Sequence, residues 1–404
     1  MSHVISPGRR RATVRVTTAL AAVGLLAGVA ACSSSSSQGS SGGSSGTTSG
    51  AANSSSATWS TQTSAAAGGG MAALIAAAKK EGHLNVITLP RDWANYGALM
   101  DGFTKKYGIA ITDANPDGSS ADEIAAIKSL KGQSRAPDVV DVGQAFAYSG
   151  SESKLFAPYQ VTTWGDIPAA AKDSAGDWYN DYGGIVSIGC DASKVNPCPT
   201  TLASLDSPAY KGKLALNGDP TQANAAINAV ASVAIAKGGS LDDVTPGIKF
   251  FAQLKKDGIY EPVQATAATI ESGETPIVID WDYLNAAKTS DVDGKGGKWT
   301  VTIPTDGGYL SGYYAQAISA SAPHPAAARL WEEYLYSVEG QNGFLAGGAR
   351  PVEQAAMTTA GTIDKTLLAK LPAVTGTPSL PTEAQATKIG ATLVQDWPSM
   401  VGGS

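Results

Sequence analysis

The segment LNVITLPRDWANYGALMDGFTKKYGIAITDANPDGSSADEIAAIKSLKGQSRAPDVVDV, residues 84–142, alternates short apolar runs with longer amphipathic patterns. Leu99, Met100 and Phe103, for example, recur at helical spacing. The patterns predict three strands, at 84–89, 109–112 and 139–142, and two helices, at 96–107 and 121–130. Strands that alternate with helices in this order are typical of a parallel sheet covered by helices. The segment therefore predicts an α/β fold.

The same alternation extends over the rest of the chain. Further strands are expected at 183–189, 213–216, 276–279, 299–303 and 313–319, and further helices at 71–81, 222–237, 244–256 and 325–339. About 330 residues follow residue 70, more than one core usually holds. We therefore expect two lobes, each a mostly parallel sheet flanked by helices.

The N-terminus resembles a lipoprotein signal peptide. Four arginines precede position 16, and the uncharged run 16–31 is too short to span a membrane. It ends in Val-Ala-Ala-Cys32, which resembles a bacterial lipobox. We predict a signal peptide over 1–31 and a lipid on Cys32; an ordinary signal peptide with a free Cys32 is the alternative.

Residues 32–70 are almost wholly Ser, Gly, Thr and Ala, which predicts a flexible, lipid-anchored linker. The protein is then expected to be exported and anchored on the outer face of the cell membrane. Removal of residues 1–31 takes four arginines and no acids, and leaves 25 basic residues against 35 acidic ones. This balance excludes a basic groove for nucleic acid.

Cys190 and Cys198 lie in the short, turn-rich segment GCDASKVNPCP. In an exported protein such a pair indicates a disulfide. A metal-binding pair is the alternative, but no histidine lies near it in the sequence.

The chain also lacks the motifs of common enzymes. No Gly-x-Ser-x-Gly elbow occurs after the linker, and His83 and His324 are the only histidines there. Clustered metal ligands and a Walker-type loop are missing as well, so neither an enzyme nor a cofactor nor a metal site is expected. Asp280 and Asp282 leave a glycosidase as the remaining enzymatic alternative.

Ligands of open α/β sheets bind outside the carboxyl ends of the strands. Five polar or aromatic segments occupy such ends: 90–93, 117–120, 143–145, 217–221 and 280–283. Each of them also suits the cap of the following helix, which is the structural alternative.

Residues 72–400 resemble the extracellular solute-binding proteins of ABC importers, in the group that binds iron, polyamines, thiamine and phosphonates. The resemblance rests on the phrases AAAKKEGHLNVIT, APDVVDVGQ, KLFAPY, AYKGKLALNGDP, ESGETPIVIDWDYL, GYYAQAISASAPHPAAARLWEEYLYSVEGQ and GGARPV. It implies a two-lobed type II periplasmic-binding-protein fold, with lobe 1 at 71–163 and about 286–345 and lobe 2 at 164–285 and about 346–404. It also implies a monomer that closes on a small-molecule solute and docks on a membrane permease.

The resemblance departs from the iron-binding branch. That branch places a histidine after the first strand, where this chain has Arg91 and Asp92, and a glutamate after the third, where it has Gly143 and Gln144. Its adjacent tyrosines are replaced by residues 280–283. Ferric iron is therefore kept only as an alternative solute.

The side chains favour an amine-bearing, polyamine-like solute. Trp281 with a neighbouring aspartate offers an aromatic face and a charge partner for ammonium. We expect the strand to end at Asp280, which turns the residues after it toward the solute. The full candidate set is Arg91, Asp92, Trp93, Ser119, Ser120, Gln144, Tyr179, Asn217, Thr221, Trp281, Asp282, Tyr283, Tyr309 and Tyr313.

Part of that set suits an anion instead. Arg91 carries positive charge, the Ser119–Ser120 pair can donate hydrogen bonds, and Thr221 precedes a helix. An anionic or zwitterionic solute, such as a phosphonate, is therefore the alternative. A sensory input to a membrane kinase is the alternative class of function.

Overall fold

The computed structural model describes residues 59–374 and 376–402 of the chain. The predicted signal peptide, Cys32 and most of the linker lie outside these residues. The sequence predicts a flexible linker as far as residue 70, whereas the structure places residues 59–70 against the folded unit. The buried guanidinium of Arg329 donates hydrogen bonds there to the carbonyl oxygens of Gln62 and Ser60, at 2.8 and 3.2 Å.

The first part of the described chain follows the predicted alternation closely. Its elements are η1 (Trp59–Thr61), α1 (Met71–Glu81), β1 (His83–Ile87), α2 (Tyr96–Tyr107), β2 (Ala110–Ala114), α3 (Ser120–Ser129), β3 (Val139–Gly143) and α4 (Gln144–Glu152). β1 pairs in parallel with β2, and Asn85 accepts a backbone hydrogen bond from Asp138 just before β3. The α/β fold predicted from this segment is confirmed.

A larger sheet has the strand order β3-β10-β5-β8-β6-β7. Its strands are β5 (Tyr179–Asp191), β6 (Leu214–Leu216), β7 (Tyr260–Gln264), β8 (Ile277–Trp281) and β10 (Ser311–Ser319). β6 is parallel to both β7 and β8, whereas β5 and β10 are antiparallel to each other and to their other neighbours. The short strands β4 (Phe156–Ala157), β9 (Trp299–Thr302) and β11 (Arg350–Pro351) pair with β10, β5 and β5.

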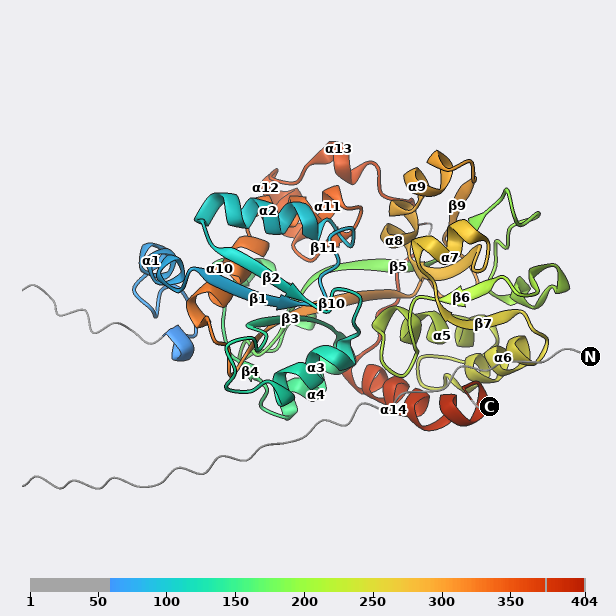
Figure 1. Cartoon of the computed structure of the whole chain (residues 1–404), viewed down its shortest axis with the longest axis horizontal. Helices are drawn as coiled ribbons and strands as arrows, with labels where there is room; N and C mark the ends of the chain where they lie inside the picture. The colour runs from blue at the N-terminus through green and yellow to red at the C-terminus, as the bar shows by residue number, and fades with distance from the viewer. Residues whose placement is uncertain (1–58, 375, 403–404) are drawn as a thin grey trace, which may run out of the picture. The chain divides into compact units, whose positions relative to one another are not determined.

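Helices cover these sheets, as Figure 1 shows. The remaining ones are α5 (Asn224–Ala236), α6 (Thr245–Lys256), α7 (Ala267–Ser272), α8 (Asp282–Ala287), α9 (Thr289–Gly294), α10 (Pro325–Leu335), α11 (Val338–Ala346), α12 (Gln354–Ala360), α13 (Lys365–Leu368) and α14 (Glu383–Met400). α14 packs against α4, α5 and α6, so it links early and central parts of the chain. Within the described ranges, no helix has the length and apolar character that crossing a membrane requires.

One predicted helix is divided in the structure. The sequence predicts a single helix over 325–339, but α10 ends at Leu335 and α11 begins at Val338. The hydroxyl of Ser337 accepts a hydrogen bond from the amide of Gly340, at 3.2 Å, and thereby caps the new helix. A side chain that satisfies an otherwise unpaired amide competes with continuation of the helix, which explains the break.

The predicted disulfide is confirmed. It joins Cys190 in β5 to Cys198 in the following loop, with the two Cα atoms 6.0 Å apart.

The end of β8 is buried beneath neighbouring chain segments. β8 ends at Trp281, one residue later than expected, and α8 begins at Asp282. The Trp281 ring lies against Gly312 of β10, where an added Cβ would stand 2.3 Å from the ring atom Cη2. The carboxylate of Asp282 forms an ion pair with Arg350, at 2.5 Å, and accepts a hydrogen bond from the amide of Ile185, at 2.9 Å. Trp281 and Asp282 thus hold β5, β8, β10 and β11 together.

Gly312→Ala should lower the free energy of unfolding by about 1–3 kcal/mol, because the new methyl group overlaps the Trp281 ring in a packed core. Gly165→Ala is the matched control, since a Cβ there has no neighbour within 4 Å. Urea unfolding of both variants checks this; equal stability of the two would contradict the packing of Trp281.

Arg350→Met should cost about 3 kcal/mol or more of unfolding free energy, because it leaves the fully buried Asp282 carboxylate without its cation. Lys106→Met breaks the exposed Lys106–Glu339 pair and should cost less than about 1 kcal/mol. The comparison is again made by urea unfolding. Similar losses in the two variants would show that the Asp282 pair does not stabilise the fold.

Candidate functional site

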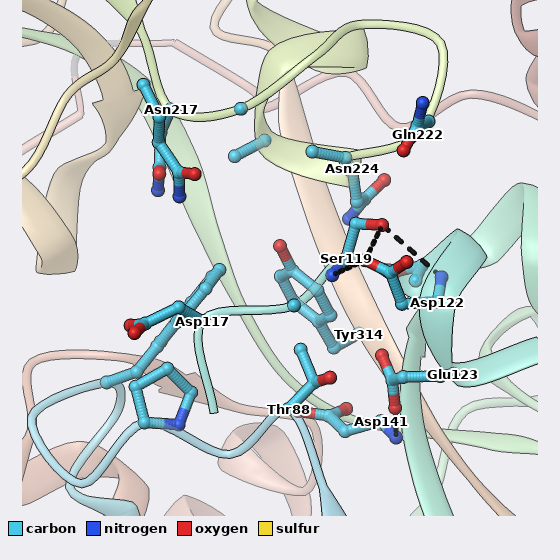
Figure 2. Close-up of a pocket in the computed structure, with 18 of the residues that line it drawn as sticks. Thr88, Asp117, Ser119, Asp122, Glu123, Asp141, Asn217, Gln222, Asn224 and Tyr314 are labelled. Atoms are coloured by element: carbon cyan, nitrogen blue, oxygen red, sulfur yellow. Dashed lines mark hydrogen bonds between the residues drawn. The ribbon is translucent and has the colours of Figure 1, made fainter. Parts of the chain in front are cut away.

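A cavity of about 190 Å³ opens where several strand ends and helix starts meet. Figure 2 shows residues from the loops after β1 and β2, the first turn of α3, strand β3, and the segment from β6 to the start of α5. This is the carboxyl-end edge at which α/β sheets place their ligands. The prediction that polar strand ends converge on one edge is therefore confirmed for the segments around residues 90, 117 and 217.

A second hollow of about 320 Å³ continues from the first. The two share the residues Pro90, Trp93, Asp117, Gly118, Asn217 and Gln264. The second hollow extends toward α7, α8 and α9 and has both apolar and acidic lining. Together the two hollows suit a solute longer than a single ion.

The lining of the first cavity is strongly acidic. Among the described residues it includes five carboxylates, Asp117, Asp122, Glu123, Asp141 and Asp219, and no Lys or Arg. In the second hollow the one basic residue, Lys288, is already paired with Asp280 at 3.1 Å. The combined site therefore carries unbalanced negative charge.

Aromatic rings form another part of the lining. Trp93 meets Tyr314 edge-on with ring centres 5.6 Å apart, and Tyr314 stacks on Tyr182 at 5.7 Å. The indole of Trp93 also donates a hydrogen bond to the hydroxyl of Tyr283, at 2.8 Å, which fixes its orientation. Aromatic faces beside carboxylates are the combination that binds organic cations.

Two acids at the inner end of the cavity are buried. Glu123 is 1 % exposed and Asp141 is 5 % exposed. The hydroxyls of Tyr96 and Tyr182 donate to Asp141 Oδ2, at 2.8 and 3.0 Å. Burial nevertheless raises the pKa of Asp141 to about 7, and burial next to Asp141 raises the pKa of Glu123 well above its usual range.

The backbone around the cavity is strained. Thr88, Ala94, Asn95 and Asn115 all have positive φ, at 57°, 46°, 68° and 48°, which side chains rarely adopt. Such residues cost about 1–3 kcal/mol each and are concentrated at ligand sites. Their position in the loops after β1 and β2 supports the assignment of this edge as the site.

The structure brings part of the predicted residue set together. Trp93, Ser119, Ser120 and Asn217 line the first cavity, and Asp92 lines the second hollow. The first four come from three separate parts of the chain. Their meeting is a property of the fold rather than of local sequence.

Other members of the set lie elsewhere. Arg91 forms an exposed ion pair with Asp101, at 2.6 Å, and Thr221 bonds to the side chain of Asp219, at 2.8 Å. The remaining predicted residues line neither hollow: Gln144, Tyr179, Trp281, Asp282, Tyr283, Tyr309 and Tyr313.

The stretch 280–283 contacts residues that line the cavity but does not line it itself. The carboxylate of Asp280 accepts hydrogen bonds from the side-chain amide of Asn217, at 3.1 and 3.3 Å, and so orients a residue that lines both hollows. Tyr283 orients Trp93 in the same way. The sequence marks this stretch as functional, and the structure shows contact with the lining rather than with the cavity.

Several lining residues are missing from the predicted set, namely Thr88, Tyr96, Asp117, Asp122, Glu123, Asp141, Tyr182, Asp219, Gln222, Asn224, Gln264 and Tyr314. The local sequence could have identified Asp141, because this residue interrupts the β-branched run VVDV. A charged residue in a buried strand requires a partner or a function. Glu123 and Tyr314 have no comparable signal in the local sequence.

Metal ligands do not gather in the described residues. No group of three or more His, Cys, Asp or Glu side chains there is arranged to hold a metal ion.

Comparison with known structures supports the same fold. AfuA of Actinobacillus pleuropneumoniae, a periplasmic binding protein with fructose-6-phosphate bound, is similar with a TM-score of 0.63 and 17% identity, over 80% of this chain and 99% of that one. Iron-bound HitA of Pseudomonas aeruginosa gives a TM-score of 0.57 and 18% identity, over 78% and 99%. AgtB of A. tumefaciens R10 in complex with agropinic acid gives 0.62 and 17%, over 80% and 99%.

These likenesses show the two-lobed type II periplasmic-binding fold that the sequence predicts. A family model described as bacterial extracellular solute-binding protein matches residues 134–369. That segment is more than half of the chain, and the protein therefore belongs to the family of bacterial extracellular solute-binding proteins.

Proposed function

We propose that this protein is the lipid-anchored receptor of an ABC importer and that its solute is a small amine-bearing, polyamine-like cation. Membership of a solute-binding family supports the receptor role, and the solute would be delivered to a membrane permease by closure of the two lobes. The observation that carries the choice of solute is the first cavity, which has five carboxylates and, among the described residues, no basic side chain.

The magnitudes favour a cation at such a site. A cation over an aromatic face gains about 0.5–2 kcal/mol, and a hydrogen bond to a charged group about 1.5–3 kcal/mol. Trp93 and Tyr314 offer faces, and Asp117 is an exposed carboxylate that makes no hydrogen bond or ion pair within the described chain. A diamine could use one acid in each hollow, because the two are continuous.

An anionic or zwitterionic solute is the second candidate. The first turns of α3 and α5 both line the cavity, and helix N-termini favour anions. AfuA, which is similar in fold, has fructose-6-phosphate bound. However, the start of α3 is already capped by Ser119 together with Asp122, whose charge faces the same space. A zwitterion would use the carboxylates for its amine and the start of α5 for its anion.

Ferric iron is less well supported. HitA is iron-bound in a similar fold, but the described residues hold no group of three His, Cys, Asp or Glu side chains arranged for a metal ion. We also propose that the predicted lipid on Cys32 and the linker keep the receptor at the outer face of the membrane, as a monomer, near its permease. A kinase rather than a permease encoded beside this chain would favour the sensory alternative.

The purified protein should be stabilised by putrescine and spermidine at hundreds of micromolar, because a ligand that binds only the folded state raises the melting temperature. Butanediol and succinate have the same carbon number as putrescine but are neutral and anionic, so neither should raise it. A thermal-shift measurement with these four compounds and with glucose 6-phosphate separates the alternatives. A rise with the phosphate alone would contradict the cation.

Asp117→Asn should weaken putrescine binding several-fold, since it removes a carboxylate that lines both hollows. Asp396→Asn, at a half-buried residue of α14 away from both hollows, is the matched control and should leave the affinity unchanged. Calorimetric titration of the two variants gives the comparison. Equal putrescine affinities of the two variants would show that the amine does not depend on the Asp117 carboxylate.

A further inference from the structure

Asp141 and Glu123 form a pair of buried acids at the inner end of the first cavity. Glu123 Oε2 accepts a hydrogen bond from the backbone amide of Asp141, at 2.9 Å, which holds the two side chains next to each other. Figure 2 shows both carboxyl groups beside each other, below Tyr314 and Ser119. Asp141 Oδ1 is buried and has no hydrogen-bond partner among the described residues. An acceptor that lines a cavity without a partner indicates that a donor belongs there.

The hydrogen bonds beneath Asp141 bring a further buried acid close to it. The Tyr96 hydroxyl lies 2.8 Å from Asp141 Oδ2 and 3.2 Å from Asp181 Oδ2, and it can give its single hydrogen to one of them only. Gln316 Nε2 donates both to the Tyr96 oxygen, at 2.9 Å, and to Asp181 Oδ2, at 3.1 Å. Asp141 therefore has buried acids on two sides, Glu123 and Asp181, and like charges at short range favour retention of a proton on such a cluster.

No positive charge compensates these acids. The titratable groups that face Asp141 come from every element around it: Tyr96 of α2, Glu123 of α3, Asp181 and Tyr182 of β5, Tyr283 of α8, Tyr314 of β10, and Glu332 and Tyr336 at α10. Within the described part of the chain this set contains no Lys, Arg or His. Burial raises the pKa of Glu332 well above its usual range; nearby Arg329 offsets this only in part, and it donates its hydrogen bonds to backbone carbonyls. The acids at the cavity thus remain without a cation of the protein.

We propose that Asp141 and Glu123 are the subsite for one ammonium group of the solute, and that the solute enters in exchange for a proton. The inference rests on the proposed function, because it assumes an amine. In the ligand-free protein the pair keeps at least one proton. When the ammonium group arrives, its N–H groups donate to Asp141 Oδ1 and to Glu123. Asp141 releases its proton to solvent, so that the total charge of the site is conserved.

The exchange makes binding depend on pH. Burial raises the pKa of Asp141 to about 7 in the free protein, and an ammonium group at contact distance would lower it. Binding therefore expels a proton at any pH below about 7, so the affinity falls as the pH falls. For one proton and a pKa of about 7, the affinity is about tenfold lower at about pH 6 than at about pH 8.

Asp141→Asn and Glu123→Gln test the subsite, with Asp113→Asn as the matched control. Asp113 is also an acid whose pKa burial raises, to about 6, but it does not line the cavity. The two site variants should bind putrescine about 10–100-fold more weakly at about pH 8, since each loses a charge-assisted hydrogen bond. The control should keep the wild-type affinity and its pH dependence.

Stability separates this role from a structural one. A buried acid without a cation destabilises the folded state when it ionises, so Asp141→Asn should leave the free energy of unfolding unchanged or raise it at about pH 8. If Asp141 only supported the fold, the same variant would lose stability and affinity together, and that result would overturn the proposal.

Titration of the wild-type protein in two buffers of different ionisation enthalpy counts the released protons without any substitution, and so remains decisive if a variant fails to fold. Release of about one proton per putrescine at about pH 6 is the expected result. Binding of putrescine without proton release, or with unchanged affinity in Asp141→Asn, overturns the subsite but leaves the proposed function intact. A wild-type protein that binds no amine overturns both.

Discussion

The antiparallel pairing of β5 with β10 is the constraint on which the site depends. β5 also pairs with β8, β9 and β11, so most of the larger sheet takes its register from this one strand. Tyr182 of β5 and Tyr314 of β10 reach the same cavity, and a register shift between Tyr313 and Ala315 falls at Tyr314. A local irregularity of this kind redirects a side chain. Backbone pairing therefore fixes the positions of Tyr182 and Tyr314 in the cavity without a contribution from a solute.

Buried acids differ in their partners within this one chain. Asp282 pairs with Arg350, Asp280 with Lys288, and Asp138 with His324. Glu332 and Glu353 are also buried, but neither forms an ion pair within the described residues. Asp141 and Glu123 likewise have only hydroxyl and amide donors, and they differ from Glu332 and Glu353 in lining a cavity. Because an unpaired buried carboxylate is costly and a solute can reach only the acids that line the cavity, a ligand is the partner that suits this pair.

The sequence was sufficient for the fold and for the edge of the site, but not for the cavity. Periodicity predicts α2 at 96–107, and two cysteines in one short, turn-rich segment of an exported protein predict the disulfide; both features are local in the sequence. The break after Leu335 depends on one serine hydroxyl and was not visible in the apolar stripe. The inward direction of Glu123 depends on packing of α3 against β3, which no local pattern encodes. Family resemblance supplied the two-lobed arrangement that periodicity alone only suggested.

The run IVIDWDYL shows why chemistry along the sequence can mislead about direct contact. Two carboxylates around a tryptophan have the composition of an ammonium site, yet Asp282 is neutralised by a residue 68 positions away and Trp281 fills the space above Gly312. A partner so distant in sequence cannot be inferred from the run itself. The run does indicate that its polar residues have partners near the site. Asp280 accepts a hydrogen bond from Asn217 and Tyr283 accepts one from Trp93, and these two partners line the cavity. Substitutions in this run would therefore change affinity and stability together, whereas at Asp141 the two should change independently.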